Sequence, residues 1–203
     1  MGPTPRTGEQ VRPFRASCQN TVGLPFRVGN AWAAAGMLRV LETIRHSSEA
    51  DNMLTERLEL TSWINEILEH AWNFQVSGGG AAAEMRSRSL TAISPPSQQS
   101  NGTLLNWLDQ ADSFPDSSST ALLGAVTYRM AALTGDLTHV SSADDAFSVI
   151  KASLTDDGWL LNTVDPLTFN TPSVPGSYSP EGQAFVLLLH SAWRDYAAAF
   201  QRK

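Results

Sequence analysis

Residues 33–75, AAAGMLRVLETIRHSSEADNMLTERLELTSWINEILEHAWNFQ, contain two amphipathic patterns separated by a short polar turn. In the first, apolar residues recur at the i, i+4, i+7, i+8 and i+11 offsets of one helical face: Ala33, Met37, Val40, Leu41 and Ile44. The second pattern runs from about Leu54 to Gln75 and has the same offsets: Leu60, Ile64, Ile67, Leu68 and Ala71. The first helix is expected to end at His46, so the segment predicts an αα-hairpin.

Helix signals continue beyond this hairpin. Asp116, followed by three serines, offers an N-cap to a helix that should stop at Gly135. Ser141 or Ser142 is expected to cap the next helix, which spans about residues 143–154.

The last helix should begin at Ser179-Pro180-Glu181 and run to about Phe200. Serine suits the cap, proline suits the first helical position, and glutamate favours the positive end of the helix dipole. No segment shows the alternating pattern of a half-buried strand. The sequence therefore predicts an all-α fold, either a bundle or part of an αα toroid.

The length and composition indicate one globular domain. The chain has 203 residues, of which 42% are hydrophobic and 17% charged. We expect an irregular N-terminal arm over residues 1–25 and a helical domain over residues 26–203. A flexible insertion is expected at about residues 77–103, because this stretch is rich in Gly, Pro, Ser and Gln.

Charge and residue counts disfavour several classes of function. The 20 acidic residues outnumber the 14 Lys and Arg, so the net charge of −6 argues against nucleic acid as a partner. Cys18 is the single cysteine and the four histidines are scattered, so neither a disulfide framework nor a metal site is expected. No cofactor motif is present, and we expect no cofactor.

Targeting signals are also missing from the sequence as written. No window is apolar enough to span a membrane, and the first residues lack the apolar core of a signal peptide. We expect a cytoplasmic protein as written, or a secreted one if the true N-terminus is missing.

Three stretches could form a ligand site. In Phe26-Arg27-Val28-Gly29-Asn30-Ala31-Trp32, aromatic rings, a cation and an amide lead into a helix, as in a carbohydrate site; alternatively, Phe26 and Trp32 are packing anchors. Residues 178–183 (YSPEGQ), with Ser179 and Glu181, offer donors at a helix start, although capping explains them equally well. Two of the acidic residues within 156–165 could act as general acid and general base; alternatively, they simply form turns.

Four segments resemble a known family. Residues 23–41, GLPFRVGNAWAAAGMLRVL, resemble the W-x-R/T-G-N-x-W-x-A-x-G segment of the unsaturated glucuronyl and rhamnogalacturonyl hydrolases, the six-hairpin glycosidases of glycoside hydrolase families 88 and 105. Residues 113–140, 157–169 and 179–196 are similar to the fungal branch of this group, and all four segments occur in the family's order.

The resemblance implies a fold, a substrate and a chemistry. It implies an (α/α)6 barrel that acts on oligosaccharides ending in a 4,5-unsaturated uronic acid, in which an aspartic acid protonates the double bond and water adds at C5. Trp32 would match the sugar-stacking tryptophan and Phe26 would replace another one, while Arg27 lies one residue from the motif's arginine. The hydroxyls of Ser177 and Ser179 would face the uronate carboxylate.

The resemblance also implies a truncation. Twelve helices at the spacing of this chain would need ~400 residues, so the chain is expected to be the C-terminal half, or about half of the toroid. The family's proton donor lies N-terminal to the matched segment, and the chain has no Asp or His before Phe26. Catalysis is therefore expected to be impaired. Two alternatives are a non-catalytic module that binds a partner or forms a homo-oligomer through the uncovered barrel face, and an incomplete gene model.

Overall fold

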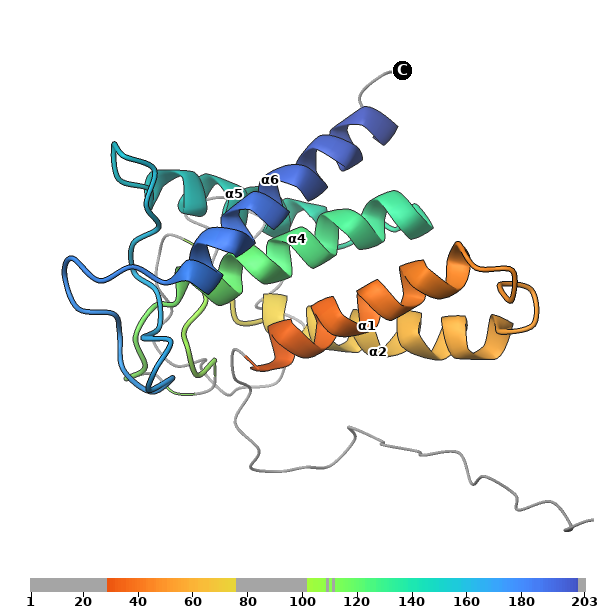
Figure 1. The fold of residues 1–203 in the computed structure, drawn as a ribbon, viewed down its shortest axis with the longest axis horizontal. Helices are drawn as coiled ribbons and strands as arrows, with labels where there is room; N and C mark the ends of the chain where they lie inside the picture. Colours follow the sequence, from red (N-terminus) through yellow and green to blue (C-terminus); the bar gives the residue numbers. More distant parts are fainter. Residues whose placement is uncertain (1–28, 76–101, 109, 111, 201–203) are drawn as a thin grey trace, which may run out of the picture.

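A computed structural model describes residues 29–75, 102–108, 110 and 112–200 (Figure 1). Phe26, Arg27, the arm at residues 1–25 and most of the insertion expected at 77–103 lie outside these ranges. Gly102 and Thr103, at the end of that insertion, are buried.

Helices α1 (Gly29–Arg45) and α2 (Leu54–Trp72) form the predicted hairpin. Its buried face on α1 differs from the predicted one, because Val40 is 50% exposed. The buried stripe instead follows a regular spacing of three and four residues: Ala31, Ala34, Leu38, Leu41 and Ile44. The two alanines are small, so the start of α1 can approach neighbouring helices closely. The larger buried residues of the stripe follow on the same face of α1.

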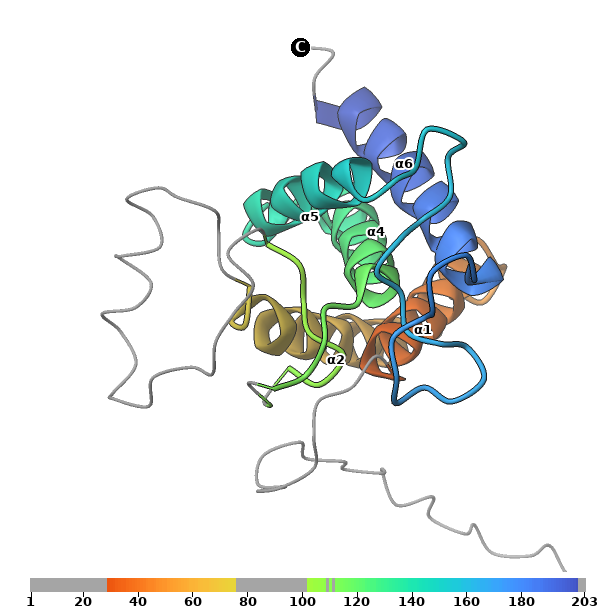
Figure 2. The same ribbon diagram turned by 90° about the vertical axis from the view of Figure 1, so that its left-hand side faces the viewer.

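Helix α4 (Ser117–Thr134) is the centre of the structure. Almost every residue from Ser117 to Ala131 is buried, which an amphipathic helix would not allow. It contacts α1 on one side and α5 (Val140–Ala152) and α6 (Pro180–Phe200) on the other. Figure 2 shows α4 in the middle of the described helices, with α5 and α6 above and beside it and α1 and α2 below it. The serine, alanine and glycine residues of α4 make room for these neighbours.

The ends of α4 confirm the capping predictions. The carboxylate of Asp116 accepts hydrogen bonds from the backbone N–H groups of Ser118 and Ser119, and Gly135 ends the helix with a φ of 77°. Such a left-handed conformation favours glycine, which has no Cβ.

The predicted start of α5 was wrong. The helix begins at Val140, one turn before the expected position, and His139 at its N-cap makes no side-chain capping bond. Ser142 is buried inside the first turn, and its carbonyl accepts a bond from the side-chain amide of Gln75. Ser142 therefore helps to join the end of the α1/α2 hairpin to α5.

The last helix begins and ends as predicted. The Ser179 hydroxyl accepts the Gly182 N–H at 3.0 Å, which caps α6. Isolated bridges pair Leu105 with Pro115, Leu154 with Leu160, and Val164 with Pro172. The all-α prediction is confirmed. None of the helices in these ranges is long and apolar enough to cross a membrane.

Candidate functional site

One end of the helical bundle collects the features that could bind a ligand. Helices α1, α4 and α6 all begin at this end, and the loop segments of residues 102–108, 112–116 and 153–179 cover it (Figure 1; Figure 2). We call it the loop end. The sequence-predicted residues within the described ranges, Asn30, Trp32, Ser177, Ser179 and Glu181, all lie here.

Trp32 occupies the first turn of α1 and combines two environments. Its ring packs edge to face against the buried Phe185 of α6, with centroids 5.0 Å apart, while 52% of the residue remains exposed. Asn30, one residue into α1, is half-buried. Trp32 is thus anchored to α6 and still offers open surface at the loop end.

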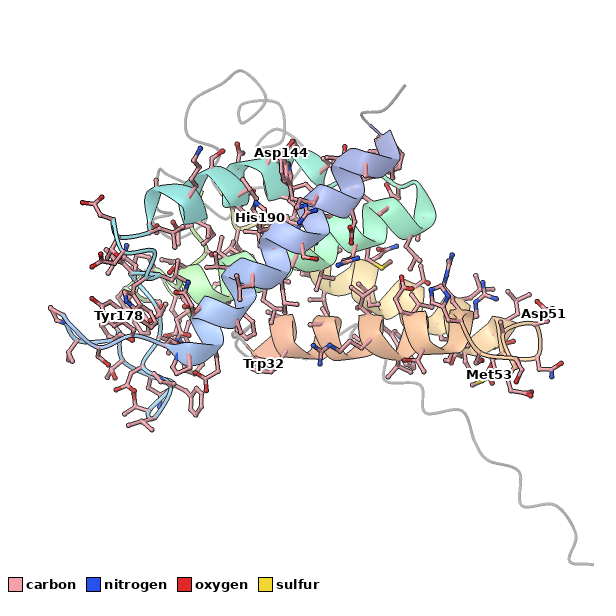
Figure 3. All side chains as sticks on the ribbon, turned by 45° about the horizontal axis from the view of Figure 1, so that its top comes forward. Trp32, Asp51, Met53, Asp144, Tyr178 and His190 are labelled. Atoms are coloured by element: carbon pink, nitrogen blue, oxygen red, sulfur yellow. The ribbon has the colours of Figure 1, made fainter. Side chains whose placement is uncertain are left out.

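Two other aromatic side chains form a parallel pair. The rings of Trp159 and Tyr178 stack with centroids 4.8 Å apart and planes 16° from parallel, and both residues are more than a third exposed. We call this pair the Trp159/Tyr178 stack. Figure 3 shows Tyr178 in the loops at the same end of the bundle as Trp32. Aromatic faces of this kind match the apolar faces of sugar rings.

The start of α6 holds Trp159 in place. The side-chain amide of Gln183 donates to the Gly158 carbonyl at 2.9 Å and accepts the Leu160 N–H at 3.0 Å. It therefore binds the backbone on both sides of Trp159. The Trp159 N–H also bonds to the Thr155 hydroxyl at 2.9 Å. Gln183 is therefore a positioning residue for the stack.

The serines and the glutamate of the predicted site have local roles. The buried Ser179 hydroxyl serves the α6 cap and also lies 3.3 Å from an oxygen of Glu181. Ser177 is exposed, and its backbone N–H bonds to the Val174 carbonyl. The geometry of Ser179 favours the capping interpretation of this stretch.

The acidic residues near this end are turn and cap residues. Asp116 is fully buried, and besides the α4 cap it accepts the Val164 N–H at 3.1 Å, which ties the 153–179 loop to α4. Asp165 accepts the Leu167 N–H within a turn, and Asp157 is exposed. Asp116 and Asp165 therefore stabilise the backbone of a helix start and a turn, as expected for acidic residues in turns. The described residues contain no group of His, Cys, Asp and Glu that could hold a metal ion.

Phe169 is a further exposed aromatic residue at this end that the sequence did not predict as part of the site. Phe169 is 62% exposed and has a φ of 59°, a conformation that costs a non-glycine residue about 1–3 kcal/mol. The buried Asn106 donates its side-chain amide to the Phe169 carbonyl at 3.2 Å. The Phe169 N–H also bonds to the Asp165 carbonyl, so Phe169 is held both within its own turn and by the distant Asn106.

The sequence matches no protein-family profile and no curated protein. Solved structures, however, match the arrangement of its helices. A possible member of the GH105 family from Salmonella enterica is 18% identical with a TM-score of 0.61, and the match covers 84% of this chain and 40% of that one. A glycosyl hydrolase of family 88 from Bacteroides vulgatus is 16% identical with a TM-score of 0.62, covering 85% and 44%. A polysaccharide lyase is 15% identical with a TM-score of 0.59, covering 87% and 44%.

The fold is part of a six-hairpin toroid. The chain spans about two fifths of the length of the toroid proteins that it matches. At identities this low, the structural match establishes the helical architecture alone. The function must be argued from the site itself.

Proposed function

We propose that this chain is a glycoside hydrolase-like protein whose loop end binds an oligosaccharide. The observation that carries the proposal is the exposed Trp159/Tyr178 stack, at the same end as the half-exposed Trp32. Sugar recognition commonly combines flat aromatic surfaces with a few polar groups, and both are present here. The matched structures, which include glycosidases and a lyase, support a carbohydrate as the ligand class.

The resemblance of four segments refines the ligand to an oligosaccharide ending in a 4,5-unsaturated uronic acid. In this proposal Trp32 and the Trp159/Tyr178 stack contact the sugar rings. Catalysis by these residues alone is expected to be impaired, because Asp116 accepts hydrogen bonds from the α4 cap and from Val164, and Asp165 accepts one within a turn. A lost general acid typically reduces the rate by 10²–10⁴-fold.

Calorimetric titration with an unsaturated digalacturonate tests the binding. We expect the native chain to bind this oligosaccharide. Trp159→Ala should bind it roughly 5- to 100-fold more weakly, because one stacking contact is lost. Phe200→Ala is the matched control, because Phe200 is also exposed but lies at the far end of α6. Equal affinities for the native chain and Trp159→Ala would refute the role of the stack.

The ultraviolet absorbance of the sugar's conjugated double bond tests the activity of the same samples. The proposal expects slow or no loss of absorbance. A turnover rate equal to that of a complete GH88 or GH105 enzyme would contradict impaired catalysis and leave the binding result unaffected.

A second function is favoured by exposed apolar residues on α6. Leu187 is 67% exposed and Leu188 is 38% exposed, next to each other on α6. This surface could serve self-association. Light scattering of the native chain and of Leu187→Lys distinguishes the cases, since a monomer in both samples excludes a stable dimer through this surface.

A further inference from the structure

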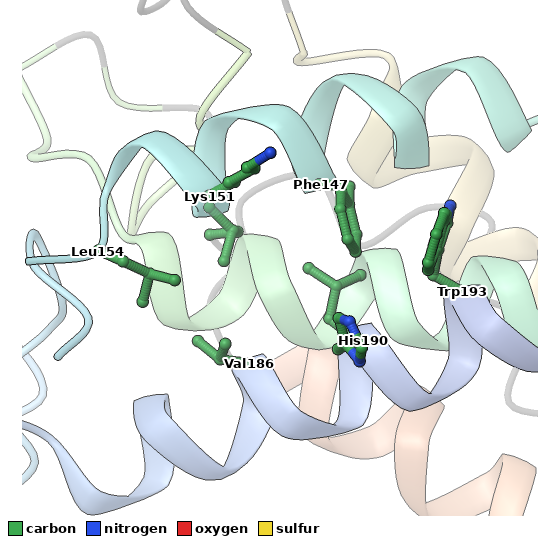
Figure 4. A pocket seen from close by; sticks show the side chains of 8 residues that line it. Phe147, Lys151, Leu154, Val186, His190 and Trp193 are labelled. Carbon is green, nitrogen blue, oxygen red and sulfur yellow. The ribbon is translucent and has the colours of Figure 1, made fainter. Parts of the chain in front are cut away.

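An apolar groove between α5 and α6 is separate from the loop-end residues named above. Its volume is about 330 Å³, within the size range of small-molecule sites. Three rings lie together along it: Phe147 of α5, with its centroid 5.2 Å from that of Trp193 and 6.3 Å from that of His190, both on α6 (Figure 4). The groove thus offers flat apolar surface at this position.

The remaining lining is aliphatic, with one cation at the edge. Leu154 and Val186 line the groove beyond the rings, and Lys151 lies on its α5 side (Figure 4). Lys151 and His190 are the ionisable residues of the lining, and neither carries a negative charge in any state. The groove therefore differs in charge from the molecule as a whole, whose net charge is −6.

Two acidic residues on the same helices have partners outside the groove. Asp144 of α5 accepts the Tyr128 hydroxyl at 2.6 Å, and Asp195 of α6 forms an ion pair with Arg129 of α4. Neither these two carboxylates nor Asp145 of α5 lines the groove, so Lys151 has no opposing carboxylate within the lining. Lys151 is exposed and lines the groove from α5.

We infer that this groove binds a small monocarboxylate with a flat apolar body. The body would lie along the rings of Phe147 and Trp193, and the carboxylate would face Lys151. A sugar fits less well, because the mostly apolar lining offers few hydrogen-bond partners for hydroxyl groups. A cationic ligand would meet Lys151 without an opposing carboxylate. Charge and shape together select an aryl carboxylate.

Calorimetric titration with 2-naphthoate, its neutral carboxamide and the corresponding naphthylmethylamine tests the inference. We expect the carboxylate to bind more tightly than the amide and the amine to bind least. An exposed ion pair contributes little, so Lys151→Gln should weaken naphthoate binding about two- to fivefold and remove its advantage over the amide. Val186→Trp, which fills the groove, should weaken all binding by roughly tenfold or more.

Two variants serve as matched controls. Leu187→Trp adds the same ring one position along α6, on a residue outside the groove lining. Arg39→Gln removes a cation from the exposed side of α1. Both should bind naphthoate as the native chain does, and thermal melts should show that all four variants are folded.

Several outcomes would overturn the inference. These are equal affinity for the carboxylate and the amide, unchanged binding to Val186→Trp, or no binding of naphthoate at millimolar concentrations. A dimer that Val186→Trp dissociates would show that a second copy occupies the groove, which also contradicts the inference. None of these outcomes bears on oligosaccharide binding at the loop end, because the two ligands and their variants are different.

Discussion

The indole ring of Trp32 meets the phenyl ring of Phe185 at 78°, so that a side chain from the first turn of α1 contacts the second turn of α6. Trp32 and Phe185 are far apart in the sequence, and no sequence pattern in α1 or α6 predicts that their rings pack together. Phe185 is 5% exposed and Trp32 is 52% exposed. The packing and ligand-binding interpretations of Trp32 are therefore compatible, since part of the residue is anchored and part is open.

Trp32→Ala should cost less stability than the loss of a fully buried tryptophan. We expect the free energy of unfolding to fall by about 1–2 kcal/mol, because about half of the residue is exposed, whereas a core role predicts ~3–5 kcal/mol. Chemical denaturation measures this loss. Trp32→Phe keeps an aromatic ring and should recover part of it. A loss near the core value without any change in oligosaccharide affinity would exclude the ligand-binding role.

Gly124→Ala should destabilise the protein although alanine favours helices. A Cβ at Gly124 would lie 3.0 Å from a methyl carbon of the buried Leu189, where α4 and α6 approach closely. We expect a net loss of about 1 kcal/mol, since crowding a packed core outweighs the gain in helix propensity.

Gly36→Ala on α1 is the matched control for this prediction. Nothing lies within 4 Å of its added Cβ, so a gain of about 0.5–1 kcal/mol is expected. Thermal melts compare the two variants. A stabilised Gly124→Ala variant would show that Leu189 can move aside at little cost.

Asp116→Ala should strongly destabilise the fold. The substitution removes the cap of α4 and leaves the buried N–H of Val164 without its partner, which together cost about 2–4 kcal/mol. Asp157→Ala, in an exposed turn, should change stability by less than about 0.5 kcal/mol. Urea denaturation measures both. If Asp116→Ala unfolded like the native chain, the carboxylate would be free for another role.

Tyr128 should make stability depend on alkaline pH. Burial, followed by the hydrogen bond to Asp144, raises the pKa of Tyr128 well above its ordinary value of 10.0. Below pH 10 its contribution to stability is complete. Above pH 10 the unfolded chain loses this proton while the folded chain retains it, so the free energy of unfolding falls by about 1.4 kcal/mol per pH unit from this group.

Tyr128→Phe isolates that contribution. The variant should be about 1 kcal/mol less stable near pH 8, because the bond to Asp144 is lost, and the difference should shrink as the pH rises from 10 to 11. Denaturation of both proteins over this range gives the difference. A difference that stays constant with pH would show that Tyr128 ionises equally in both states.

Gln183→Met should loosen the Trp159/Tyr178 stack without touching a ligand. Methionine keeps the length of the side chain but cannot make the bonds to Gly158 and Leu160. We expect faster hydrogen exchange at the Leu160 N–H and weaker oligosaccharide binding, with α6 itself intact. Unchanged exchange at this amide would show that the loop is held by other contacts.

Local sequence signals determined the helices that begin or end at strong caps. Asp116, Gly135 and Ser179 mark helix boundaries through side-chain and backbone chemistry that acts within four residues. The hairpin of α1 and α2 followed from apolar periodicity. The start of α5 could not be predicted in this way, because the helix begins without a side-chain cap and Ser142, one of the two predicted caps, is buried within its first turn.

Tertiary structure alone decided which surfaces are buried and which side chains meet. Val40 has the right spacing for a core residue and is exposed, since the packing of α1 favours the face that contains Ala31 and Ala34. Likewise, Trp159 and Tyr178 belong to separate sequence motifs, and they stack because Gln183 of α6 holds one of the two loop segments. Periodicity and capping act over one or two helical turns, whereas burial and stacking depend on neighbours that the chain supplies from a distance.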